Sequence, residues 1–188
     1  MLFPKETSIF GLTLADFHGK GKPEILVLDS SDRLRILSED GKIQWRSSDR
    51  FGGTNNSYDT KKKLDFSSRN PSPSRVYIPG RILVRDLEGE GIPQVIINRN
   101  EFGTGRIFQN VKTFDKGEIV NLVQDENGLM TNWKTREIPG YIADYQVKDV
   151  DNDGNEELVV AVVAPAEEGY AGMFSRKNKS NILFFKLF

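Results

Sequence analysis

Three segments of this 188-residue chain repeat one pattern, and this repeat limits the possible fold more than any other feature of the sequence. Each segment has an aspartate, a glycine five positions later, and then a run of β-branched or leucine side chains. The segments are Ala15–Leu28, Arg85–Asn98 and Lys148–Ala161. A second marker, a turn followed by a tryptophan, lies between them at Asp40–Trp45 and again at Asn127–Trp133. Two markers in alternating order predict a tandem array of similar units.

The pattern within each unit is typical of a β-meander, with short apolar or alternating runs separated by turns. The predicted strands are Ile25–Leu28, Leu34–Leu37, Val95–Asn98, Arg106–Phe114, Ile119–Gln124, Met130–Thr135, Tyr145–Val147, Leu158–Val163 and Asn181–Phe188. No segment shows helical periodicity over more than two turns. The sequence therefore predicts one all-β domain of three repeats, at about 9–50, 76–136 and 141–188. A segment rich in Ser, Asn, Pro and Lys, 51–75, is predicted to be an inserted surface loop.

Composition excludes several kinds of protein. Lys plus Arg is 26 and Asp plus Glu is 27, so the net charge of −1 argues against a nucleic-acid partner. The chain has no cysteine and one histidine, His18, so thiolate metal sites and His-rich sites are impossible. The longest apolar run, Leu158–Ala164, is too short to cross a membrane. The first residues lack the charged and apolar regions of a signal peptide.

The third repeat contains the strongest local signal, an acidic loop that begins at Asp149 and continues with Asp151, Asp153, Gly154 and Glu157. Oxygen ligands at positions 1, 3 and 5 of a tight loop converge on one point. These carboxylates would repel one another unless a hard cation neutralised them, and calcium accepts six to eight oxygen ligands. The loop therefore predicts a calcium site.

Two other interpretations compete with calcium at this loop. An EF-hand needs a carboxylate at position 12, where this chain has Val160, and it continues into a helix, whereas this loop continues into a predicted strand. The second alternative is an acidic turn without metal, because Asp, Asn and Gly are ordinary turn residues.

The other two loops are weaker candidates for metal. The loop at Asp86 has longer glutamate side chains and Gln94 at position 9. The loop at Asp16 has His18 and Lys20 where ligands should lie, so we expect no metal there. Lys20 could replace the charge of a cation by pairing with Asp16 and Glu24, and His18 is interpreted as a plain turn residue.

The acidic nine-residue loop between two strands, its spacing of roughly 60–70 residues and the nearby dipeptides Phe10-Gly11, Phe51-Gly52 and Phe102-Gly103 resemble FG-GAP/VCBS repeats. In that family each repeat spans most of one four-stranded β-propeller blade, as in integrin alpha chains and many bacterial extracytoplasmic proteins. The resemblance implies three blades of a larger propeller. It also implies one calcium ion, whose ligands are Asp149, Asp151, Asp153, Asn155 (through its backbone carbonyl) and Glu157.

The resemblance leaves two classes of function open. The first is a non-catalytic, calcium-binding module for protein or carbohydrate, in an extracytoplasmic (periplasmic or cell-surface) protein. The second is the propeller part of a polysaccharide lyase or hydrolase. The sequence has no nucleophile elbow, phosphate-binding glycine loop or zinc motif, so the non-catalytic interpretation is favoured. No nucleic acid and no transmembrane segment is expected.

Three further expectations concern packing. Trp45 and Trp133 occupy matched strand positions and are predicted to lie in the core rather than to stack on a ligand. The Lys61–Lys63 run is predicted to be a solvated loop. Because propellers close with four to eight blades and this chain has markers for three, we expect further blades or a second copy to be needed for closure.

Overall fold

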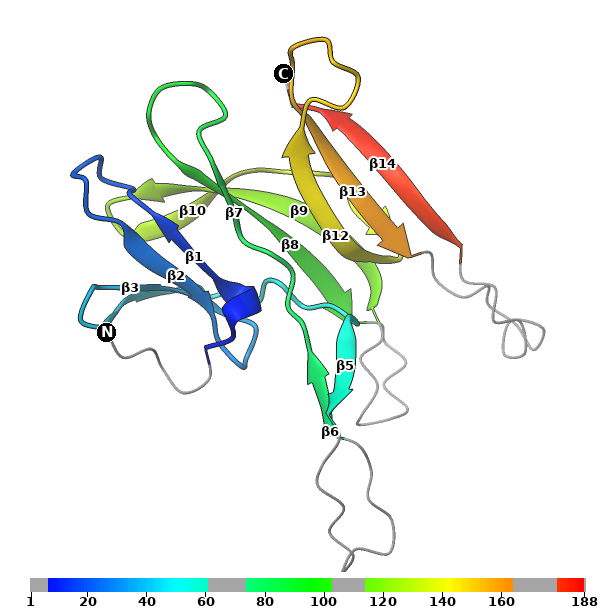
Figure 1. The fold of residues 1–188 in the computed structure, drawn as a ribbon, viewed down its shortest axis with the longest axis horizontal. Helices are drawn as coiled ribbons and strands as arrows, with labels where there is room; N and C mark the ends of the chain where they lie inside the picture. The colour runs from blue at the N-terminus through cyan, green and yellow to red at the C-terminus, as the bar shows by residue number, and fades with distance from the viewer. Residues whose placement is uncertain (1–6, 61–73, 103–113, 164–178, 188) are drawn as a thin grey trace, which may run out of the picture.

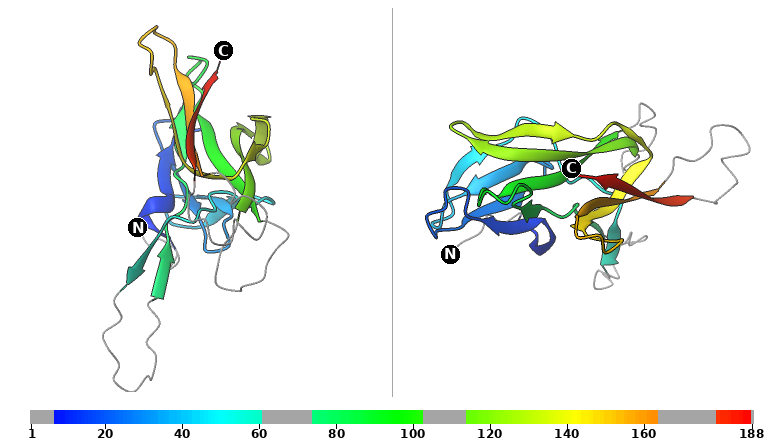
Figure 2. Two further views of the ribbon diagram at one scale, coloured as in Figure 1. Left: turned by 90° about the vertical axis from the view of Figure 1, so that its right-hand side faces the viewer. Right: turned by 90° about the horizontal axis from the view of Figure 1, so that it is seen from above.

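The computed structural model describes residues 7–60, 74–102, 114–163 and 179–187, and these residues form an all-β protein, as predicted. The one helical element among these described residues is a short 3₁₀ turn, η1 (Ile9–Gly11). Three antiparallel sheets follow one another across the molecule, and a two-stranded hairpin projects from the central region (Figure 1). Figure 2 shows the same sheets edge-on and from above. In the described part of the chain, no helix is long and apolar enough to cross a membrane.

The first sheet is a four-stranded meander in the order of the sequence. Its strands are β1 (Leu12–Ala15), β2 (Glu24–Leu28), β3 (Leu34–Leu37) and β4 (Ile43–Arg46). Four consecutive residues of β2, from Ile25 to Leu28, are buried, because this central strand carries apolar side chains on both faces. The two strands predicted here, at 25–28 and 34–37, are confirmed.

The second sheet repeats the meander, with longer second, third and fourth strands. They are β7 (Leu83–Arg85), β8 (Gln94–Phe102), β9 (Phe114–Asp125) and β10 (Gly128–Lys134), and a short strand, β11 (Ile138–Pro139), pairs with the start of β9. The predicted strand at 106–114 lies outside the described residues except for its last residue, Phe114, which is the first residue of β9.

The third sheet contains three described strands, β12 (Tyr141–Lys148), β13 (Glu157–Val163) and β14 (Ser180–Lys186). Strand β14 pairs with β13 along its whole length, from Ser180 to Lys186. The other edge of β14 has no strand partner among the described residues. Within the described ranges, this sheet therefore has three strands, whereas the meander of each of the other two has four.

The segment predicted to be an inserted surface loop, 51–75, differs from that prediction in two ways. Residues 51–54 are buried, because Phe51 belongs to the core and the main chain that follows it crosses the interior. There Gly52 N donates to Asn98 O, and Gly53 O accepts hydrogen bonds from the side-chain amides of Asn98 and Asn100. Farther along, β5 (Ser57–Thr60) pairs with β6 (Ser74–Tyr77) as a hairpin. The Lys61–Lys63 run lies outside the described residues.

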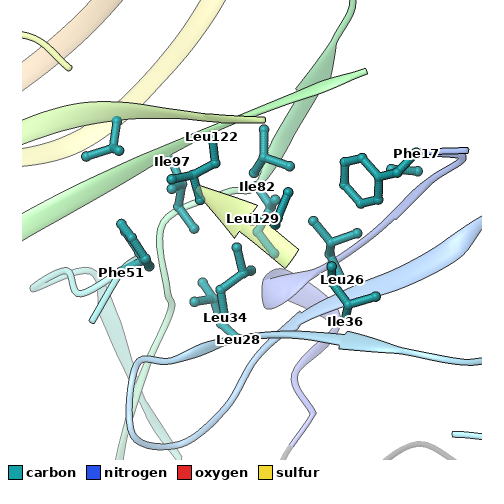
Figure 3. Close-up of a cluster of buried hydrophobic side chains, with 13 residues drawn as sticks. Phe17, Leu26, Leu28, Leu34, Ile36, Phe51, Ile82, Ile97, Leu122 and Leu129 are labelled. Carbon is teal, nitrogen blue, oxygen red and sulfur yellow. The ribbon is translucent and has the colours of Figure 1, made fainter. Parts of the chain in front are cut away.

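The hydrophobic core consists of two main clusters, one at each junction between sheets. Figure 3 shows the first cluster, in which Leu26 and Leu28 of the first sheet meet Ile97 and Leu122 of the second. The second cluster joins Ile96 and Ile119 of the second sheet to side chains of the third sheet, which include Tyr145, Leu158 and Val160. The sheets are therefore stacked face to face, with the second in the middle.

Both tryptophans lie on the outer strand of their sheet, directly after a β-bulge. In β4, Ile43 and Trp45 pair with neighbouring residues of β3, and in β10, Thr131 and Trp133 pair with neighbouring residues of β9. The residue just before each tryptophan therefore has no partner in the adjacent strand, which defines a β-bulge. Each side chain is half-buried against the cluster that faces the next sheet. Their matched positions are confirmed, whereas their burial is only partial.

Candidate metal centre

Three Asp loops connect the first two strands of each sheet, and all three lie along one rim of the molecule (Figure 1). The first Asp loop is 16–24, the second is 86–94 and the third is 149–157. In each loop, position 1 is the aspartate that marks the repeat. The loops can therefore be compared position by position within one molecule.

The three loops share one backbone conformation. Positions 4 and 6 are left-handed in all of them, at φ 62° and 68° in the first loop, 71° and 78° in the second, and 60° and 92° in the third. The amide of position 6 donates to the position-1 carboxylate in every loop, over 2.6 Å for Gly21, 2.7 Å for Gly91 and 3.0 Å for Gly154. This conformation needs glycine at position 6, because side chains with a Cβ rarely adopt a positive φ.

In the first two loops, the side chains at positions 3 and 9 contact each other. In the first, the His18 ring nitrogen Nδ1 lies 3.2 Å from Glu24 Oε2, and in the second, Gln94 Nε2 donates to Glu88 Oε1 over 3.2 Å. Both contacts join position 3 to position 9. The expectation that Lys20 would pair with Glu24 is therefore corrected: His18 pairs with Glu24, and Lys20 reaches Asp16 through its main-chain N–H.

The third loop has carboxylates at both of these positions, Asp151 and Glu157, so neither can donate a hydrogen bond to the other when ionised. Instead, one oxygen from each of Asp149, Asp151 and Asp153 comes within 4.8 Å of the others. These are the three side chains that the sequence predicted at positions 1, 3 and 5. Three carboxylates this close repel one another unless a cation or a proton lies between them.

Asp149 has an oxygen atom that lacks the hydrogen-bond partner found in the other two loops. Its Oδ1 is shielded from solvent and accepts no hydrogen bond from the described residues. In the other loops the corresponding oxygen accepts the position-5 amide, from Lys20 or from Glu90, each over 3.1 Å. In the third loop that amide, Asp153 N, is 3.2 Å from Asp151 Oδ1. The change leaves Asp149 Oδ1 without a partner on a residue of the acidic cluster.

The other two predicted ligands lie on the same loop but not within this cluster. Asn155 N donates to Asp153 Oδ1 over 2.8 Å, which fixes the main chain at position 7, where a carbonyl ligand is expected. Glu157 is almost fully buried, and its Oε2 accepts the Val150 amide over 3.1 Å. Glu157 does not belong to the group of side chains whose oxygens lie within 4.8 Å. In this structure it closes the loop from the strand side.

The position-1 aspartate of the first loop shows how the main chain holds a carboxylate in its charged form. Desolvation alone would raise the pKa of Asp16, but hydrogen bonds from the amides of Lys20 and Gly21 hold it below its ordinary value. In the third loop, hydrogen bonds from the main chain and the side chain of Asn155 lower the pKa of Asp153. These hydrogen bonds thus favour the ionised forms of Asp16 and Asp153.

A cavity of about 290 Å³ lies beside the third loop. It is lined by Leu87 of the second loop, by Gly154, Asn155, Glu156 and Glu157 of the third, and by Lys186 and Leu187 at the end of β14. Lys186 opposes Glu157 in the strand register. The cavity therefore places apolar and cationic groups next to the acidic cluster.

Sequence reasoning found the acidic residues but missed the pairing of positions 3 and 9. The signal was present in the sequence, because His18 with Glu24 and Glu88 with Gln94 are complementary pairs, whereas Asp151 with Glu157 is not. A scan against models of known protein families finds no match to this chain, and a search of curated proteins finds none either. The functional argument therefore depends on the geometry of the site.

Proposed function

We propose that this chain is a non-catalytic interaction module, stabilised by one calcium ion in the third Asp loop. We further propose that its sheets are blades of a propeller of the FG-GAP/VCBS type in an extracytoplasmic protein. The protein would bind protein or carbohydrate through the rim on which the Asp loops lie. The observation that carries the proposal is Asp149 Oδ1, a buried and unpartnered oxygen within a cluster of three carboxylates.

The donor set supports a hard cation. Three aspartates, the carbonyl of Asn155 and the carboxylate of Glu157 offer only oxygen, and calcium accepts six to eight oxygens in loose geometry. Asp149, Asp151 and Asp153 would hold the ion through their side chains, and the ion would offset the repulsion among these three carboxylates. A buried acceptor without a partner costs roughly 1–3 kcal/mol, so an ion at Asp149 Oδ1 favours the folded state.

The arrangement of the sheets supports an interaction module. Two four-stranded meanders and one three-stranded meander stack in the order of the sequence, and their equivalent loops share one rim. The cavity between the second and third loops opens beside the cation site and contains Lys186. A partner with apolar and basic groups would complement this part of the rim, where two glutamates and one lysine line the cavity.

Thermal unfolding tests the metal part of the proposal. In excess calcium the melting temperature should exceed that in EDTA, because an ion that binds only the folded state at a hundred times its dissociation constant stabilises it by about 2.7 kcal/mol. Asp151→Asn should remove this difference. Glu88→Gln, which makes the same change at position 3 of the second loop, should leave it intact. Identical curves for the wild-type protein in calcium and in EDTA would contradict the proposal.

Incubation with acidic polysaccharides tests the non-catalytic part. Polygalacturonate and alginate should remain intact with calcium present, as measured by the ultraviolet absorbance of unsaturated products for a lyase and by new reducing ends for a hydrolase. Product formation by the wild-type protein that Asp151→Asn abolishes would contradict this part and favour a lyase.

A further inference from the structure

The position-9 residue of each Asp loop is also the first residue of a central strand, so strand register fixes which residues flank it. In the first sheet, Glu24 lies opposite Ala15 of β1. In the second sheet, Gln94 lies opposite Arg85 of β7. In these two sheets, no carboxylate at position 9 therefore lies opposite a cationic residue of the first strand.

The third sheet places a lysine on each side of its position-9 carboxylate. Glu157 lies opposite Lys148 of β12 and also opposite Lys186 of β14. Directly opposed side chains of an antiparallel pair point to the same face of the sheet, with Cβ atoms about 4.5–5.5 Å apart. Both lysines are exposed, whereas Glu157 is buried. The acidic loop therefore leads into a strand whose first residue is flanked by two positive charges.

Neither of these lysines is held in an ion pair. Within the described part of the chain, Lys148 and Lys186 form no ion pair with a carboxylate. Glu157, which lies between them, accepts the Val150 amide at its Oε2 over 3.1 Å. The two ammonium groups therefore act on the loop through space and not through a direct contact.

The charge of Lys186 reaches the acidic cluster. Its side chain lines the cavity beside the third loop, together with Gly154 and Asn155. Hydrogen bonds from Asn155 are the main cause of the lowered pKa of Asp153, and the positive charge of Lys186 lowers this pKa further. A nearby cation stabilises an ionised carboxylate and repels a second cation. Lys186 and a bound calcium ion would therefore compete for the same negative charges.

We propose that Lys148 and Lys186 are the resident counter-charges of the third Asp loop and that they weaken its calcium binding. In the ion-free protein they offset the repulsion among the three aspartates, and in the loaded protein their charge opposes the ion. The affinity of a calcium site depends on its charge count, so the two lysines set the calcium concentration at which the loop loads. This inference rests on the proposed calcium site and adds the residues that tune it.

Calorimetric titration of the full chain with calcium chloride at low ionic strength tests the proposal. Lys186→Gln removes one positive charge, so its dissociation constant should fall roughly fivefold, the size expected for a unit charge near a divalent ion across solvent. Lys148→Gln should change the affinity in the same direction, whereas Lys186→Arg keeps the charge and should bind as the wild-type protein does. Lys22→Gln is the control, because it removes an exposed lysine from the first Asp loop and should leave the affinity unchanged.

Melting in EDTA gives a second readout, which needs no calcium. Lys186→Gln should melt below the wild-type protein in EDTA, and saturating calcium should reduce this difference. An equal loss in both conditions, with an unchanged dissociation constant, would mean a purely structural role and would overturn the proposal. A wild-type protein that binds no calcium would overturn the proposed function and this inference together. Calcium binding by the wild-type protein with the same affinity in Lys186→Gln would overturn this inference alone.

Discussion

The second and third Asp loops have the same backbone and differ in the hydrogen-bond partners of their polar side chains. In the second loop, Asp86 accepts two main-chain amides and Glu88 accepts the side-chain amide of Gln94. In the third loop, Asp149 accepts one amide at Oδ2, and its Oδ1 lies unpartnered beside two more aspartates. One loop fold can thus be closed by a hydrogen bond between side chains or left open for a cation.

The largest expected effect is the loss of a tryptophan from the outer strand of the first or second sheet. It tests whether these two sheets are equivalent in their outer strands as well as in their Asp loops. Trp45→Ala and Trp133→Ala should each lower the free energy of unfolding by about 3 kcal/mol, toward the low end for core aromatics because both side chains are half-buried. Trp45 lies against Gly128 of the second sheet, where an added Cβ would be 2.1 Å from its ring. Chemical denaturation measures the change, with Met130→Ala, exposed on β10, as the control. A large loss of unfolding free energy for only one of the two variants would contradict the equivalence of Trp45 and Trp133.

The next prediction exchanges the two loops at positions 3 and 9. Asp151→Glu with Glu157→Gln gives the third loop the pair found in the second, and it should abolish the calcium-dependent stabilisation of about 2.7 kcal/mol at saturating ion. Glu88→Asp with Gln94→Glu should destabilise the protein in EDTA, and calcium should reverse that loss. Calorimetric melting curves of both double variants give the answer. A calcium response that survives the first exchange would show that positions 3 and 9 do not decide metal binding.

A third prediction concerns Asp29, a buried carboxylate that is paired with arginines, unlike the aspartates of the third Asp loop. Asp29 is buried beside Arg35 and Arg46 and accepts the amides of Ser31 and Arg33. Burial would raise the pKa of Asp29, but the main-chain hydrogen bonds and the Arg35 charge hold it below its ordinary value. Its stabilisation is therefore complete above the unfolded-state pKa of about 4 and is lost as pH falls through the lower folded-state pKa.

Asp29→Asn should accordingly cost roughly 1.5–3 kcal/mol at pH 7, and the cost should shrink toward pH 2. Urea denaturation across this pH range measures it. Asp59→Asn is the control, because Asp59 forms an exposed pair with Arg75 and should change little. A cost that is independent of pH would exclude the charge of Asp29 as its origin.

The smallest expected effect tests the shared backbone itself. Gly91 and Gly154 have φ values of 78° and 92°, and a Cβ at either would meet no atom within 4 Å. Alanine at each position should therefore cost only backbone strain, about 1 kcal/mol. Equal costs in EDTA are expected, and unequal costs would mean that the loops do not share one conformation without the ion.

Much of this fold could be predicted from the sequence because its signals are local. Asp and Gly at fixed spacing mark the Asp loops, and the apolar runs after them mark the central strands, which the structure confirms at Glu24–Leu28, Gln94–Phe102 and Glu157–Val163. The path of Phe51 into the core could not be predicted, because its polar surroundings in the sequence indicate a loop. Its burial depends on Asn98 and Asn100, distant residues whose side chains bond the main chain at Gly53.

The candidate site was predictable in composition but not in detail. The spacing of Asp149, Asp151 and Asp153 is sufficient to predict that they converge, because a tight loop forces alternate side chains to one side. The partner of each oxygen depends on small differences in main-chain direction. In the third loop the Asp153 amide donates to Asp151 at position 3, whereas the equivalent amides of the other loops donate to the aspartate at position 1. This difference leaves Asp149 Oδ1 without a partner.

A crystal structure of the protein grown with calcium would test the central claim most directly. Our account predicts one ion in the third Asp loop, at about 2.3–2.6 Å from oxygens of Asp149, Asp151 and Asp153. It also predicts that the first and second loops keep their His18–Glu24 and Glu88–Gln94 contacts and hold no ion. A third loop without an ion at saturating calcium, or ions bound equally in all three loops, would contradict the account.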